Sequence, residues 1–277
     1  MPTNFLDLHI VDYCQLRCRH CYLNKGDTAM PLDMVRNVCA DFLDTGFPLP
    51  ENTIILSGGD PLLHPEFTEI CRIVRELCGR VVLSTNGIRI PEVIDAFQAS
   101  DSIQVSVDGD REAHDSIRGE GSYEKAVGGL GILKARRINH SISFTVNKQN
   151  VKCIDHIIDL CRKTESSLLN FNLYQPIQDN GLEPLTFTQW VTLKNDVRKK
   201  LKRHRIQVFD TCVEKGCIAG ILGISVLPDG TYWDCSRNQK IVGKYPQRIK
   251  NVLFWDLIHQ HGTRDQFQTC CKRLFYG

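Results

Sequence analysis

The sequence predicts an α/β protein whose core is a partial barrel of about six β/α units. Two observations carry this prediction: strand-like and helix-like segments alternate from residue 5 to about residue 205, and turn motifs follow several of the strands. Strands that alternate with helices at this spacing pair in parallel through right-handed crossovers. Because a closed eightfold barrel usually takes about 250 residues, the shorter series indicates an open or partial barrel.

The predicted strands are short apolar runs, and the predicted helices have apolar residues at a helical spacing. The strands cover residues 5–11, 53–56, 81–83, 103–107, 142–146 and 168–173. The first helix opens at Pro31, which suits a first helical turn, and carries apolar residues at Met34, Val35, Val38, Phe42 and Leu43. The other helices cover about residues 65–77, 91–99, 123–137, 151–164 and 187–204.

The composition changes after residue 205. The remaining segment contains glycine and cysteine and shows no clear alternation of strands and helices. We therefore expect two domains, the partial barrel at residues 1–205 and a small cysteine-rich α+β extension at residues 206–277.

The net charge excludes some classes of function. The 34 Lys and Arg nearly balance the 32 Asp and Glu, so the composition predicts no nucleic acid or membrane partner. A basic run at residues 198–205 is interpreted as a solvated helix end rather than a phosphate site. No signal peptide precedes the first strand, and no apolar run approaches the ~20 residues of a membrane span. We expect a soluble, cytoplasmic protein.

The 13 cysteines indicate bound metal more than disulfides, because their number is odd and no export signal is present. Cys14, Cys18 and Cys21 lie within eight residues, and a second group gathers near the C-terminus. The remaining cysteines lie in helical patterns or at a helix end, where a small buried side chain is expected. These are Cys39, Cys71, Cys78, Cys153 and Cys161.

The three N-terminal cysteines have CxxxCxxC spacing on the loop after the first strand. Such a loop can direct three thiolates at three corners of a cubane iron-sulfur cluster, which leaves one iron open to another ligand. A zinc site is one alternative, although zinc usually takes four ligands. Three core thiols are another, and the polar neighbours Arg17, Arg19 and His20 disfavour it.

This loop resembles the signature of the radical S-adenosylmethionine superfamily, CxxxCxΦC, with His20 before the last cysteine and Tyr22 after it. The resemblance covers roughly residues 5–205 and implies a partial (β/α)6 radical SAM barrel. It also implies a [4Fe-4S] cluster on Cys14, Cys18 and Cys21, with S-adenosylmethionine on the open iron. The implied reaction is reductive cleavage of S-adenosylmethionine to a 5′-deoxyadenosyl radical, which removes a substrate hydrogen.

Further motifs resemble the family's cofactor-binding elements. Ser57-Gly58-Gly59-Asp60-Pro61 is similar to the GGEP element, which binds the methionine amino group, and Asp60 stands where glutamate is usual. Arg118, in the segment from His114 to Gly119, is implied as a cationic clamp for the methionine carboxylate. The other implied contacts are Ser84, Asn86, Ser106 and Asn147, and the sequence assigns no catalytic acid or base.

The C-terminal cysteines resemble the twitch and SPASM extensions of the same superfamily. Pro228-Asp229-Gly230 predicts a hairpin turn between Cys217 and Cys235. The resemblance implies one auxiliary [4Fe-4S] cluster, and a zinc ribbon is the alternative. The implied ligands are Cys212, Cys217, Cys235 and Cys271, with Cys270 as the alternative to Cys271.

The resemblance leaves the substrate open. A ribosomally made peptide, crosslinked or oxidised with help from a separate recognition protein, is favoured over a sugar or amino alcohol oxidised by a small-molecule dehydrogenase. An electron donor such as flavodoxin or ferredoxin is implied in either case. A non-catalytic metal-binding regulator is the alternative from another class, and it predicts no cleavage of S-adenosylmethionine.

Overall fold

The computed structural model describes residues 4–45, 52–176, 179–210, 223–236 and 239–252. The chain forms two compact units. Unit 1 comprises Met1–Cys14, Leu23–Leu83 and Lys215–Gly277, and unit 2 comprises Gln15–Tyr22 and Ser84–Glu214. Cys212, Cys217, Cys270 and Cys271 lie outside the described residues.

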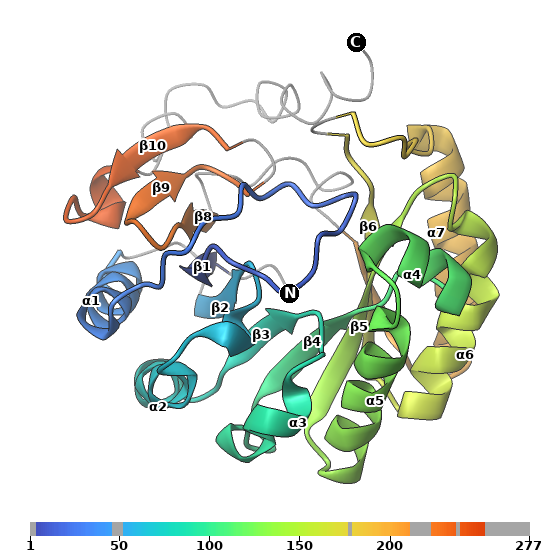
Figure 1. The fold of residues 1–277 in the computed structure, drawn as a ribbon, viewed down its shortest axis with the longest axis horizontal. Helices are drawn as coiled ribbons and strands as arrows, with labels where there is room; N and C mark the ends of the chain where they lie inside the picture. Colours follow the sequence, from blue (N-terminus) through green and yellow to red (C-terminus); the bar gives the residue numbers. More distant parts are fainter. Residues whose placement is uncertain (1–3, 46–51, 177–178, 211–222, 237–238, 253–277) are drawn as a thin grey trace. The chain divides into compact units, whose positions relative to one another are not determined.

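Unit 1 is a mixed sheet in which distant parts of the chain lie side by side (Figure 1). β1 pairs in parallel with β2 on one side and with β8 on the other, and β9 and β10 extend the sheet from β8 in antiparallel order. Val82 and Leu83 of β3 pair in parallel with β2. These strands are β1 (Asn4–Val11), β2 (Asn52–Gly58), β3 (Val82–Thr85), β8 (Gly223–Val226), β9 (Thr231–Trp233) and β10 (Ile241–Lys244).

Helices α1 (Leu32–Leu43) and α2 (Phe67–Cys78) pack on this sheet, and short 3-10 turns lie at Pro61–Leu63 and Ile249–Asn251. The alternate apolar residues of β1, Leu6, Leu8 and Ile10, are fully buried. Because successive strand residues point to opposite faces, Asp7 and His9 lie on the other face of β1. Unit 1 therefore has one apolar face and one face with polar side chains.

Unit 2 is built from parallel strands in the order β4-β5-β6-β7, with helices between them. The strands are β4 (Ser102–Ser106), β5 (Asn139–Val146), β6 (Leu168–Leu173) and β7 (Gln207–Asp210). The helices are α3 (Ile90–Val93), α4 (Arg111–Arg118), α5 (Ser122–Ala135), α6 (Ile154–Thr164) and α7 (Phe187–Lys202), with 3-10 turns at Ile94–Ala96 and Val151–Cys153. α5 packs on β4 and β5, and α6 packs on β5 (Figure 1).

The structure corrects one sequence-based helix prediction and contains a helix and a strand that were not predicted. The helix predicted at residues 91–99 ends early, because Phe97 is extended and the Asp101 carboxylate accepts a hydrogen bond from Gln98 N at 2.8 Å. Helix α4 was not predicted, although Asp110 caps its start by accepting from Ala113 N at 3.0 Å. Strand β7 was also missed.

The hairpin predicted around Pro228-Asp229-Gly230 is present between β8 and β9. Gly230 adopts a φ of 83°, which glycine tolerates without a Cβ clash, and the Asp229 carboxylate accepts from Thr231 N at 2.9 Å. A separate domain at residues 206–277 stays a prediction. None of the helices in the described part of the chain is both long enough and apolar enough to cross a membrane.

Candidate functional site

The cysteine loop lies directly after β1. Cys14, Cys18 and Cys21 are half-buried and none of the three forms a disulfide. Cys14 belongs to unit 1, whereas Cys18 and Cys21 belong to unit 2. Within unit 2, Cys21 N donates to Cys18 O at 3.1 Å, so a tight turn brings these two residues together. Arg19 N donates to Ile117 O at 2.8 Å, which attaches the same turn to α4.

A buried ion-pair cluster, formed by His20, Asp108 and Arg118, supports this turn. Asp108 Oδ2 accepts from Arg118 Nε at 2.6 Å and lies 2.9 Å from His20 Nε2. The Asp108 side chain is fully buried, and those of His20 and Arg118 are 9% and 11% exposed. Asp108 Oδ1 accepts from Thr145 N at 2.9 Å, so both carboxylate oxygens have partners.

The charges in this cluster compensate the cost of burial. Burial raises the pKa of Asp108, but the charges of Arg118 and His20 outweigh it and hold that pKa well below its usual range. Burial by itself would lower the pKa of Arg118. The Asp108 carboxylate and the Cys18 and Cys21 thiolates outweigh burial and raise this pKa above its usual value. Asp108 is therefore a carboxylate, and Arg118 is a cation beside two of the three loop cysteines.

Arg118 was predicted to clamp a methionine carboxylate, and the structure gives it an internal carboxylate partner. Arg118 Nε donates a hydrogen bond to Asp108, and Arg118 Nη2 lies 3.4 Å from His20 Nε2. No described residue accepts a hydrogen bond from Nη1. One edge of the guanidinium thus remains for an external anion, and the clamp stays a prediction.

Gly58 and Gly59 bring two backbone segments of unit 1 into close contact. Gly59 N donates to Val11 O at 2.9 Å, and Asp60 N donates to Tyr13 O at 3.0 Å. A Cβ at Gly59 would lie 1.9 Å from Tyr13 O, and Gly58 combines a φ of 117° with a similar clash at Val11 O. Only glycine permits this approach between the end of β2 and the residues that precede Cys14.

Replacing Gly59 with alanine is expected to displace this loop. The new methyl group would clash with Tyr13 O, and the backbone must shift to make room for it. This shift should lower the free energy of unfolding by about 1–3 kcal/mol and weaken S-adenosylmethionine binding. Denaturant unfolding and equilibrium dialysis measure the two effects. Gly131→Ala is the matched control, because a Cβ there meets nothing within 4 Å in α5 and should stabilise the helix by about 0.5–1 kcal/mol. Equal stability of both variants would contradict the prediction.

Asp60 is buried, and its side chain forms a hydrogen bond within the turn that it begins. Its side chain is 1% exposed, and Oδ1 accepts from Leu62 N at 3.0 Å to cap the Pro61–Leu63 turn. The contact with a methionine amino group, implied by resemblance, stays a prediction.

The other predicted contacts lie at carboxyl ends of strands in unit 2. Ser84 Oγ accepts from Gln104 Nε2 at 3.2 Å, and Asn86 Oδ1 accepts from Gln15 Nε2 at 3.2 Å. Ser106 is half-buried at the last position of β4. Asn147 follows β5, and its Nδ2 is buried without a partner among the described residues. An unpartnered buried donor is rare in a folded protein and is consistent with a ligand contact at Asn147.

Sequence reasoning missed a polar cluster on β1. Asp7 Oδ2 lies 3.1 Å from His9 Nε2 and 3.4 Å from Ser225 Oγ, and Ser57 and Ser236 also donate to the Asp7 carboxylate. Ser236 follows Cys235, a predicted ligand of the auxiliary cluster, and the Cys235 side chain is half-buried. The signal was present as two polar residues, Asp7 and His9, at alternate positions of the otherwise apolar strand predicted at residues 5–11.

Asp7 is expected to make stability depend on pH. Burial raises its pKa, but the His9 charge and the hydrogen bonds from His9, Ser236 and Ser57 lower it to about 2. Since the folded-state pKa is below the unfolded value, this stabilisation is complete above about pH 4 and lost as the pH falls toward 2. We expect Asp7→Asn to lower the free energy of unfolding by on the order of 2 kcal/mol near pH 6, and by less near pH 3.

Urea unfolding at both pH values measures this difference. Asp95→Asn is the control, because the Asp95 side chain is 86% exposed and its ion pair with Arg136 is a surface contact. A destabilisation by Asp7→Asn that is the same at both pH values would contradict the expectation.

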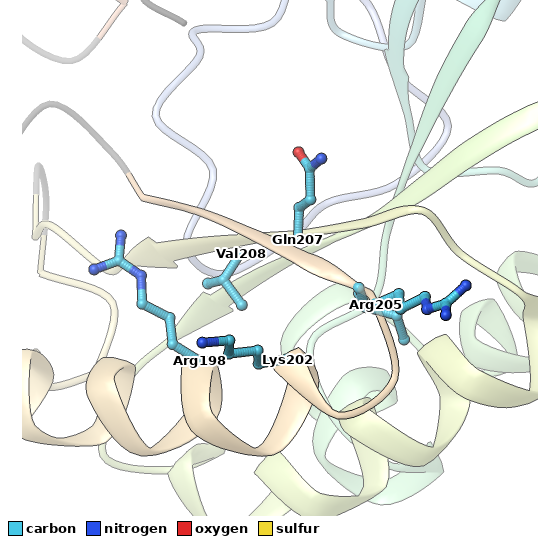
Figure 2. Close-up of a pocket in the computed structure, with 6 residues that line it drawn as sticks. Arg198, Lys202, Arg205, Gln207 and Val208 are labelled. Carbon is cyan, nitrogen blue, oxygen red and sulfur yellow. The ribbon is translucent and has the colours of Figure 1, made fainter.

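A groove of about 450 Å³ lies where the basic run ends (Figure 2). Arg198 and Lys202 extend from α7 beside Val208 of β7, whereas Arg205 points away from Arg198. Because these cations do not converge on one point, the groove does not form a compact phosphate site. The interpretation of a solvated helix end agrees with this arrangement.

Among the described residues, no three or more His, Cys, Asp or Glu side chains are gathered into a group that could hold a metal ion. The fit to the implied cofactors therefore rests on the chemistry of the loop thiols and of their neighbours. His20, the neighbour of Cys21, has a buried Nδ1 without a partner among the described residues. The cationic Arg118 beside Cys18 and Cys21 compensates the negative charge of a thiolate-bound cluster. The close approach at Gly58 and Gly59 holds the end of β2 against Val11 and Tyr13, which shortly precede Cys14 in the chain.

Parallel strands that alternate with helices, and a three-cysteine loop after the first strand, define an α/β protein with the thiols that an iron-sulfur cluster takes as ligands. Residues 8–161 match the model of the radical SAM superfamily. The chain belongs to this superfamily of enzymes, whose members bind a [4Fe-4S] cluster and S-adenosylmethionine. The predicted fold class, a partial barrel of this family, is confirmed.

Two curated relatives illustrate the range of the similarity. The AdoMet-dependent heme synthase of Methanosarcina barkeri is 31% identical over 155 residues, which are 54% of this chain and 44% of that protein. The mycofactocin maturase of Mycolicibacterium smegmatis is 32% identical over 160 residues, which are 56% of this chain and 41% of that protein. The matched part therefore spans less than half the length of either relative.

Two solved structures share the fold. Streptococcus suis SuiB bound to S-adenosylmethionine superposes with a TM-score of 0.74 at 14% identity, over 96% of this chain and 68% of that chain. Native anSMEcpe with bound AdoMet and the Cp18Cys peptide gives a TM-score of 0.69 at 17% identity, over 100% of this chain and 88% of that chain. At these identities the similarity establishes the fold alone.

Proposed function

We propose that this enzyme cleaves S-adenosylmethionine reductively and uses the resulting 5′-deoxyadenosyl radical to crosslink or oxidise a ribosomally made peptide. The observation that carries the cleavage step is the turn of Cys18 and Cys21, supported by buried Asp108 and Arg118. The similarity to the mycofactocin maturase supports a maturase, and the similar fold of anSMEcpe, solved with the Cp18Cys peptide, supports a peptide substrate.

The proposed ligands of the first cluster are Cys14, Cys18 and Cys21. The [4Fe-4S] cluster, when bound, supplies one electron to S-adenosylmethionine. Asp108 fixes the orientation of Arg118 through Nε, and the uncommitted edge of Arg118 binds the methionine carboxylate. In unit 1, Gly58, Gly59 and Asp60 are assigned to the amino group. In unit 2, the other assigned contacts are Ser84, Asn86, Ser106 and Asn147.

A second [4Fe-4S] cluster is part of the proposal, with Cys235 as its described ligand. Cys235 follows β9, and the hydrogen bond from Ser236 to Asp7 attaches its loop to β1. The other proposed ligands are Cys212, Cys217 and Cys271, or Cys270 in place of Cys271. An electron donor such as flavodoxin or ferredoxin and a separate peptide-recognition protein complete the proposed set of partners.

Anaerobic reconstitution tests the proposal. Two clusters predict about eight irons per chain, and 5′-deoxyadenosine should form when dithionite and S-adenosylmethionine are added. Co-expression with a candidate precursor peptide should yield a peptide lighter by about 2 Da for each oxidation or crosslink, which reports the loss of two hydrogens. Zinc in place of iron, or no 5′-deoxyadenosine from iron-loaded protein, would overturn the proposal.

A further inference from the structure

The strands of unit 2 have an uncharged polar face. On β4, β5 and β6, the residues that alternate toward the helices are apolar and buried: Ile103, Val105, Ile142, Phe144, Val146, Leu169, Phe171 and Leu173. The residues on the opposite face carry amide or hydroxyl groups, except for Leu168 at the start of β6. They are Ser102, Gln104 and Ser106 on β4, Asn139, Ser141, Ser143 and Thr145 on β5, and Asn170 and Asn172 on β6. Ser102 and Asn139 lie at the strand starts and Ser106 is assigned to S-adenosylmethionine, so we call the other six residues the amide face.

Hydrogen bonds connect the amide face across the strands. Asn170 Nδ2 donates to Gln104 Oε1 at 2.7 Å, and Gln104 Nε2 donates to Ser84 Oγ at 3.2 Å. Asn172 Nδ2 donates to Ser143 Oγ at 3.0 Å. Asn170 can reach Gln104 across β5 because that strand carries small side chains, Ser141 and Ser143, between them. The amide groups are therefore ordered before any ligand binds.

This ordered face retains hydrogen-bonding capacity. Asn170 Oδ1 is a buried acceptor without a partner among the described residues, although its Nδ2 is bonded. The unpartnered donor at Asn147 Nδ2 is already assigned to S-adenosylmethionine, so Asn170 Oδ1 is the group that is left for another ligand. Since a buried polar group without a partner costs about 1–3 kcal/mol, this acceptor indicates a missing hydrogen-bonding ligand.

The chemistry of the amide face discriminates between substrate classes. A polycarboxylate, such as a porphyrin, requires arginine or lysine partners when it binds away from water. The amide face has none, and its donors and acceptors match those of peptide groups. The bonded side chains of Gln104 on β4 and Asn170 on β6 cross two strand spacings, about 10 Å, which an extended segment of about three residues spans.

We propose that the amide face binds the main chain of an uncharged peptide segment and that it disfavours polycarboxylate substrates. This inference rests on the proposed function and deepens it, because it names the substrate class and Asn170 as a residue that contacts it. The Asn170 side chain accepts from a peptide N–H through Oδ1 while its Nδ2 stays on Gln104.

Binding to the reconstituted holoenzyme tests the inference. Immobilised protein is exposed, without oxygen and with S-adenosylmethionine, to a pool of N-acetylated, C-amidated peptides without ionisable side chains, and the retained peptides are quantified by mass spectrometry. Coproporphyrin III is the polycarboxylate probe. We expect peptides to be retained and the porphyrin to be excluded, and Asn170→Leu to reduce retention about tenfold through the lost hydrogen bond and the buried group left without a partner.

Two further variants complete the test. Asn170→Ser keeps a polar side chain and should reduce retention in the same direction if Asn170→Leu does not fold. Asn139→Leu, at the exposed start of β5, is the matched control and should retain peptides as wild type does. Tighter binding of coproporphyrin III than of peptides, or unchanged retention in both Asn170 variants, would overturn the inference.

The wild-type preparation separates this inference from the proposed function. Formation of 5′-deoxyadenosine without peptide retention would contradict the amide face alone. Iron-loaded protein that produces no 5′-deoxyadenosine would contradict the proposed function itself.

Discussion

Replacing Cys18 with alanine is expected to abolish S-adenosylmethionine cleavage. Cys18 is one of three proposed thiolate ligands, and two thiolates cannot position a cubane cluster with one open iron. We expect 5′-deoxyadenosine formation to fall by at least about a hundredfold, since loss of a group that only orients a metal ligand already costs ten- to a hundredfold. Iron and sulfide analysis should show that about four irons per chain are lost.

Cys78→Ala is the matched control for Cys18→Ala. Both cysteines are half-buried, but burial raises the pKa of the Cys78 thiol to about 11, so that it is not a thiolate near neutral pH. Cys78→Ala should retain full iron content and activity. Cleavage that persists in Cys18→Ala at the wild-type rate would exclude the N-terminal loop as the cluster site.

Replacing Asp108 with asparagine is expected to produce the largest loss of stability. Asparagine keeps the shape of the side chain but leaves the buried Arg118 cation without its carboxylate partner. Breaking a buried ion pair in this way costs about 3–5 kcal/mol. Thermal unfolding should shift downward by about 10 °C, given about 2–4 °C per kcal/mol for a chain of this size. Cleavage of S-adenosylmethionine should also fall, because Arg118 and His20 lose their orientation.

Asp110→Asn provides the comparison, two residues along the chain. Asp110 is half-buried and caps α4, a role that asparagine performs about as well as aspartate. Its unfolding temperature should therefore stay near that of the wild type. An Asp108→Asn variant no less stable than Asp110→Asn would show that the ion pair does not stabilise unit 2.

The regular parts of the fold were predictable from local patterns. The strand at 103–107 was found within one residue of β4 because its apolar residues alternate, and the hairpin at Asp229 and Gly230 was found because its turn has a strong local signal. Local patterns failed where a tertiary contact decides. The helix predicted at 91–99 is cut short by the Asp101 side chain, which binds a backbone N–H that the helix would have used.

The candidate site was predictable only in its motifs. Arg118 was recognised by its charge and by the motif around it, from His114 to Gly119. Its partner Asp108 precedes Gly109, and an Asp-Gly pair by itself indicates only an ordinary turn. The cluster with His20 joins three segments that only the fold brings together, at sequence separations that no periodicity describes. The bonds from Ser225 and Ser236 to Asp7 were hidden for the same reason.

The parallel pairing of β1 with β8 sets an order of events during protein synthesis. Asp7 receives a hydrogen bond from Ser225, 218 residues later in the chain, so β1 leaves the ribosome long before its second neighbour exists. All of unit 2 up to β7 emerges within that interval and can fold first. Until β8 arrives, one edge of β1 and the carboxylate of Asp7 are uncovered, which makes the nascent chain a candidate client for chaperones that protect strand edges.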